Sequence, residues 1–301
     1  MSRHFLHILD IPREEMLPLV LRAQQLKAVR AHSHLLAGKT VLLVFEKAST
    51  RTRLSFEMAV RELGGSTIFM TPMESQLGRS EPLKDSARVF SRYVHGLVVR
   101  TFGQDKLEEL VQYGEIPVVN ALTDTYHPCQ VMSDLLTMYE RTPDLQNQVV
   151  AWVGDGNNMA NSWINAAAKL GFQLQLAVPK GYEPEPRHIE QARHAGARIM
   201  LTHDPRQAVA GADYVNTDVW ASMGNEAEVE ERTRAFAGYL VDENLLQLAK
   251  PGAKVMHCLP AHRGEEISEA VMEGEASIVW DQAENRLHMQ KALLEWVFAR
   301  S

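Results

Sequence analysis

Short apolar runs alternate with helical stretches along the whole chain, and this alternation constrains the fold more than any other feature of the sequence. Each run has the length of one strand, and each stretch between runs repeats apolar residues at helical spacing. Strand–helix alternation of this kind is typical of parallel sheets that are covered by helices on both faces. The sequence therefore predicts an α/β fold built on doubly wound parallel sheets.

The runs fall into two consecutive sets, which predicts two domains, and a length of 301 residues agrees with that number at ~100–200 residues per domain. We place the domains at 1–142 and 143–283, because Thr142, Pro143 and Asp144 interrupt a helical pattern. A C-terminal helix at 284–301 is expected to pack back on the first domain. The expected strands are 41–45, 67–70, 97–100, 117–120, 149–154, 173–178, 198–201, 214–217, 254–256 and 277–279. The expected helices are 52–63, 107–113, 131–141, 162–170, 187–195 and 284–300.

The overall charge excludes some classes of partner. The chain has 31 Lys and Arg against 38 Asp and Glu, which gives a formal net charge of −7, whereas nucleic-acid binders need clustered cations to neutralise phosphates. No apolar run approaches the ~20 residues that span a bilayer. Only two cysteines are present, which is typical of a reducing compartment. We therefore expect a soluble, cytoplasmic protein that binds neither nucleic acid nor membrane.

A cationic helix start follows the first apolar run. Lys47, Arg51 and Arg53 surround Ser and Thr residues at this point, although the partial positive charge of a helix N-terminus favours acidic residues there. A bound anion would offset this arrangement, because N–H groups, hydroxyls and guanidinium groups together suit phosphate. The alternative is a capped surface helix whose arginines pair with Glu57 or Glu62.

Other polar side chains also stand where strands are expected to end, which is where ligands bind in such sheets. Arg100 is either a second anion ligand or a member of a surface ion pair. His127 either donates to a carbonyl oxygen of a ligand or makes a structural hydrogen bond. Asp218 and Ser222 suit an amino group, or else form an Asx-type loop. Cys258 is either a reactive or orienting thiol or a buried small apolar residue.

The residues present in the motifs disfavour two further classes of site, a dinucleotide-binding loop and a metal site. A glycine-rich loop at Gly154 and Gly156 has Met159 in place of the third glycine of a dinucleotide-binding loop, and the next expected strand ends in Val178-Pro179-Lys180, with no acidic residue there for a ribose. No H-E-x-x-H motif or pair of C-x-x-C motifs occurs, so no metal site is expected.

Taken together and in order, the motifs resemble those of the aspartate and ornithine carbamoyltransferases over essentially the whole length of the chain. The S-T-R-T-R and H-P-x-Q motifs are shared by both branches of this family, whereas S-M-G and H-C-L-P are similar to the ornithine branch. The matching segments are Ser49-Thr50-Arg51-Thr52-Arg53, His127-Pro128-x-Gln130, Asp218-Val219-Trp220-x-Ser222-Met223-Gly224, His257-Cys258-Leu259-Pro260 and Glu284-Asn285-Arg286.

The resemblance implies an activity and an assembly. The ornithine branch transfers the carbamoyl group of carbamoyl phosphate to the δ-amino group of L-ornithine, a step of arginine metabolism that yields L-citrulline and phosphate. It uses no metal or organic cofactor. Two α/β domains with an interdomain active-site cleft, and a homotrimer or a multiple of trimers, are the arrangement that the family implies.

The resemblance also implies the roles of individual residues. Gln76 lies in a polar loop similar to the family segment that reaches the site of a neighbouring subunit, and Cys258 would orient the amine, with no covalent intermediate. The catalytic residues would be Arg100, His127, Cys258 and Arg286. Carbamoyl phosphate would be bound by Ser49, Thr50, Arg51, Thr52, Gln76, Arg100, His127, Gln130, Cys258, Leu259 and Arg286. Ornithine would be bound by Asn158, Asp218, Ser222 and Met223.

Two alternatives to this function stay open at the level of sequence. The first keeps the fold and changes the acceptor to aspartate, putrescine or an N-acylornithine. The second is a ligand-binding paralogue without catalytic activity, which the retention of all five motifs disfavours.

Overall fold

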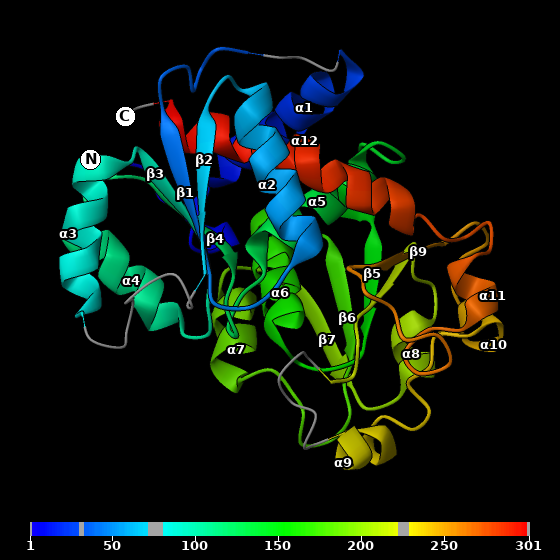
Figure 1. Ribbon diagram of the computed structural model, residues 1–301. Helices are drawn as coiled ribbons and strands as arrows, with labels where there is room; N and C mark the ends of the chain where they lie inside the picture. Colours follow the sequence, from blue (N-terminus) through cyan, green and yellow to red (C-terminus); the bar gives the residue numbers. More distant parts are fainter. Residues whose placement is uncertain (1, 30–32, 72–80, 222–228, 300–301) are drawn as a thin grey trace. The chain divides into compact units, whose positions relative to one another are not determined.

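A computed structural model describes residues 2–29, 33–71, 81–221 and 229–299 of the chain. It divides into two compact units (Figure 1). Unit 1 consists of Met1–Leu136 and Asn285–Ser301, and unit 2 of Thr137–Glu284. Each unit is built on one parallel sheet with its own apolar core.

The sheet of unit 1 has four parallel strands in the order β2-β1-β3-β4. The central strands β1 and β3 are almost wholly buried, which explains why they are continuous apolar runs in the sequence. The strands are β1 Thr40–Phe45, β2 Ser66–Met70, β3 Gly96–Arg100 and β4 Val118–Leu122.

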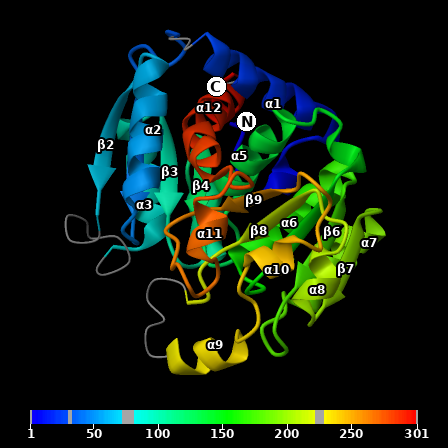
Figure 2. The ribbon, with the colours of Figure 1, turned by 90° about the vertical axis from the view of Figure 1, so that its right-hand side faces the viewer.

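Helices cover both faces of this sheet, with α3 and α4 on one side and α2 on the other (Figure 1). From Asn285 onward, α12 lies beside α1 (Figure 2), where Lys27 Nζ donates to Asn285 Oδ1 at 2.8 Å and Arg22 pairs with Glu295 at 2.6 Å. The helical segments of this part are η1 Ile8–Asp10, α1 Arg13–Ala28, α2 Thr50–Glu62, α3 Leu83–Tyr93, α4 Gln104–Tyr113, α5 Pro128–Tyr139 and α12 Val279–Phe298.

The sheet of unit 2 has five parallel strands in the order β7-β6-β5-β8-β9. Val153 of β5 and Val215 of β8 pack into a core that also receives side chains of α8, α10 and α11. The strands are β5 Val149–Val153, β6 Gln173–Ala177, β7 Arg198–Thr202, β8 Tyr214–Thr217 and β9 Lys254–His257. The helical segments are η2 Leu145–Asn147, α6 Asn158–Leu170, α7 Pro186–His194, α8 Pro205–Val209, α9 Val229–Ala235, α10 Glu243–Leu246 and α11 Glu269–Met272.

Both sheets contain a point at which the strand order reverses. It lies between β1 and β3 in unit 1 and between β5 and β8 in unit 2. In open α/β sheets, ligands bind beyond the carboxyl ends of the strands at this reversal. The topology therefore directs attention to Arg51 and Arg100 in unit 1, and to Asn158 and Asp218 in unit 2.

The predicted fold class, two α/β domains with parallel sheets, is confirmed. The strand expected at 277–279 is wrong: Ser277 makes only an isolated bridge to Val255, and Val279 already begins α12. A three-residue apolar run does not distinguish a strand from the first turn of a buried helix. In the described part of the chain, every helix is too short or too polar to cross a membrane.

Candidate active site

The start of α2 is capped in the way that its sequence predicts. Ser49 is the N-cap, and its hydroxyl accepts a hydrogen bond from the backbone N–H of Thr52 at 3.4 Å. The first turn contains no acidic residue. This cap leaves the partial positive charge of the helix start uncompensated within its own first turn.

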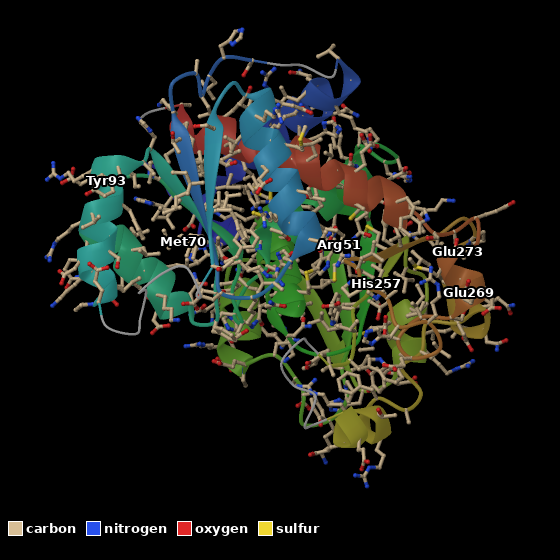
Figure 3. All side chains as sticks on the ribbon, viewed as in Figure 1. Arg51, Met70, Tyr93, His257, Glu269 and Glu273 are labelled. Atoms are coloured by element: carbon tan, nitrogen blue, oxygen red, sulfur yellow. The ribbon has the colours of Figure 1, made fainter. Side chains whose placement is uncertain are left out.

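The three cations near this helix start have different partners. Arg53 donates to Glu57 at 2.8 Å, as the surface-helix alternative expected, whereas Lys47 pairs with Asp124, which that alternative did not name. Arg51, which lies at the start of α2 (Figure 3), is exposed and makes no ion pair with any residue that the structure describes. Of the three, Arg51 is therefore the cation that remains for an anion.

A second group of cations is buried in the same unit. Arg100, at the end of β3, and Arg286, in α12, are only 6% and 5% exposed. His127, which directly precedes α5, is buried as well, with 7% of its surface exposed. Burial, the charge of Arg286 and that of Arg100 together hold the pKa of His127 well below its usual 6.5. His127 is therefore a neutral imidazole beside two guanidinium groups, an environment that favours an anion.

Arg286 joins the first two motifs of the sequence. Its Nη1 donates to Gln130 Oε1 at 2.6 Å, and its Nη2 donates to Thr52 Oγ1 at 3.1 Å. All three side chains are at least nine-tenths buried. The structure thus brings residues of α2, α5 and α12 into one hydrogen-bonded group.

Cys129, inside the H-P-x-Q motif, is chemically inert. Its side chain is fully buried, and its thiol donates to the carbonyl oxygen of Asn120 at 3.2 Å. Burial raises the pKa of this thiol to about 12. Since the thiolate is the reactive form, Cys129 takes no part in chemistry at neutral pH.

The neutral state of His127 leads to a prediction about acid stability. Its pKa is lower in the folded than in the unfolded chain, so the unfolded chain binds more protons and stability falls as the pH drops below the unfolded value of 6.5. The variant His127→Gln should therefore lose less free energy of unfolding than the wild type between about pH 7.5 and about pH 5. Urea unfolding at a series of pH values measures this difference, and the exposed His262→Gln serves as the control. Equal slopes for wild type and His127→Gln would contradict the assignment.

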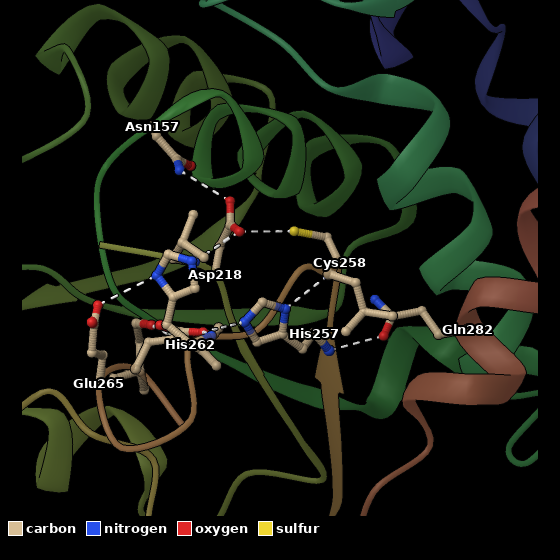
Figure 4. Close-up of polar contacts among 12 residues, drawn as sticks. Asn157, Asp218, His257, Cys258, His262, Glu265 and Gln282 are labelled. Carbon is tan, nitrogen blue, oxygen red and sulfur yellow. Dashed lines mark hydrogen bonds and ion pairs between the residues drawn. The ribbon is translucent and has the colours of Figure 1, made fainter. Parts of the chain in front are cut away.

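In unit 2, Asp218 is held at the end of β8 by three donors (Figure 4). Cys258 Sγ donates to Asp218 Oδ1 at 2.9 Å, the N–H of Val219 donates to the same oxygen at 2.8 Å, and Asn157 Nδ2 donates to Oδ2 at 3.4 Å. Burial raises the pKa of Asp218, and the thiol and the Val219 N–H oppose this effect. The result is a buried carboxylate that attracts cations and accepts protons readily.

His257 orients the H-C-L-P segment through hydrogen bonds to Glu266 and Leu259. Its Nε2 donates to Glu266 Oε1 at 2.8 Å, and its Nδ1 accepts the N–H of Leu259 at 2.8 Å, so the ring is the neutral Nε2–H tautomer. Leu259 adopts a φ of 59°, which is unusual for a non-glycine residue. The N–H of Leu259 is thus engaged within the protein.

Some predicted residues are not placed, and some placed residues were not predicted. Gln76, Ser222 and Met223 lie outside the described residues. Asn158 is the first residue of α6, directly after the N-cap Asn157, whose side chain also reaches Asp218. Glu266 was missed because no motif precedes it; only its distance of nine residues from His257 hinted at a shared loop.

Two groups of described side chains have the donor types of a metal site. The first consists of Asp218, His257 and Cys258. Both ring nitrogens of His257 are already engaged, so metal binding there would break an existing hydrogen bond. The second consists of His262, Glu265 and Glu266, of which only Glu266 is buried.

Comparison with protein families gives a match to each half of the chain. Residues 3–140 match the model of the aspartate/ornithine carbamoyltransferase carbamoyl-P binding domain, and residues 146–297 match that of the Asp/Orn binding domain. The candidate residues of unit 1 other than Arg286 fall in the first match, and those of unit 2 fall in the second.

Individual relatives are similar over their whole length. The chain is 64% identical to an ornithine carbamoyltransferase of Oleidesulfovibrio alaskensis and 62% identical to one of Nitratidesulfovibrio vulgaris, in each case over 99% of both chains. Among solved structures, ornithine carbamoyltransferase of Pyrococcus furiosus superposes with a TM-score of 0.95 at 43% identity over 100% of this chain and 98% of that one. The anabolic enzyme of Campylobacter jejuni gives 0.94 at 42% identity over 99% and 100%.

Proposed function

The chain belongs to the aspartate/ornithine carbamoyltransferase family, and on this basis we propose the role of each candidate residue in the reaction. It is an enzyme that transfers the carbamoyl group of carbamoyl phosphate to ornithine. The observation that carries this conclusion is the full-length similarity to proteins named for that activity. Neither another acceptor nor a non-catalytic role is favoured by these relatives.

Carbamoyl phosphate binds to unit 1 in this proposal. Its phosphate occupies the start of α2, where Ser49, Thr50, Arg51 and Thr52 supply N–H groups, hydroxyls and one guanidinium group. This assignment is supported by Arg51, which has no ion pair among the described residues, and by the absence of acidic side chains in the first turn. Gln76 of a neighbouring subunit completes the phosphate site.

The carbamoyl group lies against the buried cations. Arg100, His127 and Arg286 surround its oxygen, and Gln130 together with the backbone of Cys258 and Leu259 holds its NH₂ group. Attack on the carbonyl carbon creates a tetrahedral oxyanion, which buried, preoriented donors stabilise far more than water does. Because the imidazole of His127 is neutral, it contributes through an N–H dipole rather than through a full charge.

Ornithine binds to unit 2, where Asn158, Asp218, Ser222 and Met223 contact it. Its δ-amino group must lose a proton before it attacks, and its free pKa is near the ~10.4 of lysine. The carboxylate of Asp218, whose pKa burial raises, draws the ammonium in and accepts that proton. Cys258 keeps Asp218 oriented through its 2.9 Å hydrogen bond and forms no covalent intermediate.

The assembly is a homotrimer or a multiple of trimers. Support comes from exposed apolar side chains on α2 and on β2, which is an edge strand of the unit 1 sheet: Leu54 and Met58 on the helix and Ile68 on the strand. Clustered apolar residues beside a sheet edge are typical of an interface between protein chains. The enzyme works in the cytoplasm, in arginine biosynthesis.

The test of the function is a panel of acceptors with carbamoyl phosphate as the donor. Citrulline should form from ornithine faster than the carbamoyl products of aspartate, putrescine or N-acetylornithine, because Asp218 attracts a cationic acceptor. The native mass, measured on the same sample, should be three times the chain mass of 33.9 kDa or a multiple of that. Faster turnover of any other acceptor would overturn the assignment, and binding of ornithine without turnover would indicate the non-catalytic alternative.

A further inference from the structure

One buried carboxylate in unit 1 is absent from every motif discussed so far. Asp134 lies in the middle of α5 and is fully buried. Its Oδ1 accepts a hydrogen bond from Gln130 Nε2 at 2.8 Å, across one turn of the helix. Asp134 thus contacts a residue of the proposed carbamoyl phosphate site from the side away from Arg286.

The two partners of Gln130 fix the orientation of its amide. Arg286 can only donate, so the oxygen of Gln130 must face Arg286, and its NH₂ group then faces the Asp134 oxygen that accepts from it. A carboxylate that accepts from Nε2 also polarises the amide and makes Oε1 a stronger acceptor. Asp134 therefore tightens the 2.6 Å contact between Gln130 and Arg286.

The orientation extends from Arg286 to the start of α2. While Nη1 donates to Gln130, Nη2 donates to Thr52 Oγ1 at 3.1 Å. Since that hydroxyl accepts from Arg286, its own hydrogen is directed to another acceptor. In the proposed site this acceptor is the phosphate. The hydrogen bonds that link Asp134 to Thr52 through Gln130 and Arg286 therefore leave the Thr52 hydroxyl free to donate to a bound anion.

We propose that Asp134 is a positioning residue for carbamoyl phosphate, which acts through Gln130 and Arg286 and never touches the substrate. The inference rests on the proposed carbamoyl phosphate site of unit 1. It assigns Asp134 the task of keeping the amide of Gln130 and the guanidinium of Arg286 in the one arrangement that presents donors to the substrate.

The isosteric variant Asp134→Asn tests this role. Its neutral amide polarises Gln130 less and can itself donate, which removes the fixed direction. The KM for carbamoyl phosphate and the Kd for inorganic phosphate should each rise roughly tenfold, the change expected when a hydrogen bond to a charged group is weakened. The KM for ornithine should change by less than about twofold, because unit 2 is untouched. Steady-state kinetics and phosphate titration calorimetry give these values.

Ser133→Ala is the matched control on the same helix. Ser133 is also fully buried, and its hydroxyl donates to the carbonyl oxygen of Cys129 at 2.7 Å. Its loss should lower the Tm and leave phosphate affinity unchanged. If Asp134→Asn does not fold, the smaller Asp134→Ser should fold without a steric clash and show the same loss of phosphate affinity.

The inference would be overturned if Asp134→Asn left both the phosphate affinity and the KM for carbamoyl phosphate unchanged. It would also be overturned if Ser133→Ala, with the same fall in Tm as Asp134→Asn, lost as much phosphate affinity. Failure of the proposed function looks different. In that case the wild type forms no citrulline, while the titration still compares the phosphate affinity of Asp134→Asn with that of Ser133→Ala.

Discussion

Replacement of Arg51 with alanine should lower kcat/KM for carbamoyl phosphate by about 10²-fold to 10³-fold, the cost of removing a preoriented charge from a transition state. Arg51 stands in the first turn of a helix that has no acidic residue there and pairs with no described carboxylate. In the proposed site, this guanidinium group would hold the phosphate both in the substrate and as it departs. Steady-state kinetics at varied carbamoyl phosphate measure the loss.

Arg53→Ala is the control for Arg51→Ala. Arg53 lies on the same helix, yet its guanidinium donates to Glu57 at 2.8 Å and stacks over the ring of Phe69 at 3.7 Å. Its removal should cost less than about 1 kcal/mol of stability, as for other exposed pairs, and leave kcat/KM nearly unchanged. Equal effects of the two substitutions would show that general positive charge, rather than Arg51 itself, binds the phosphate.

Replacement of Asp218 with asparagine should lower kcat/KM for ornithine roughly a thousandfold, because the variant loses both the attraction for the ammonium and the proton acceptor. The same variant should be at least as stable as the wild type. The folded pKa of Asp218 lies above its unfolded value of 3.8, so its ionisation at neutral pH opposes folding, and asparagine removes that cost. Kinetics and urea unfolding at neutral pH test the two halves of this prediction.

Cys258→Ser separates orientation from covalent chemistry. A serine hydroxyl can still donate to Asp218, so substantial turnover should remain and the KM for ornithine should rise only modestly. Loss of turnover equal to that of Asp218→Asn, or a trapped carbamoyl thioester, would show that the thiol acts as a nucleophile.

The sequence was enough to place those residues of the candidate site whose position depends on strand ends and motifs. Arg100 and Asp218 stand where the parallel sheets place ligand-binding residues, and the pattern of apolar runs was enough to locate them. Residues whose role depends on a distant partner were beyond prediction. Lys47 looked equivalent to Arg51 until the fold brought Asp124 to it, and Asp134 looked like an ordinary helix residue until its contact with Gln130 was seen.

The division of the chain makes unit 1 depend on two segments that are far apart in the sequence. Unit 2 is one continuous segment, whereas unit 1 is closed only by its last residues, which begin at Asn285. Without these residues, Gln130 and Thr52 lack Arg286, and Glu62 lacks the ammonium group of Lys291. A chain cut before Asn285 would therefore lack these partners, so the proposed phosphate site depends on residues at both ends of unit 1.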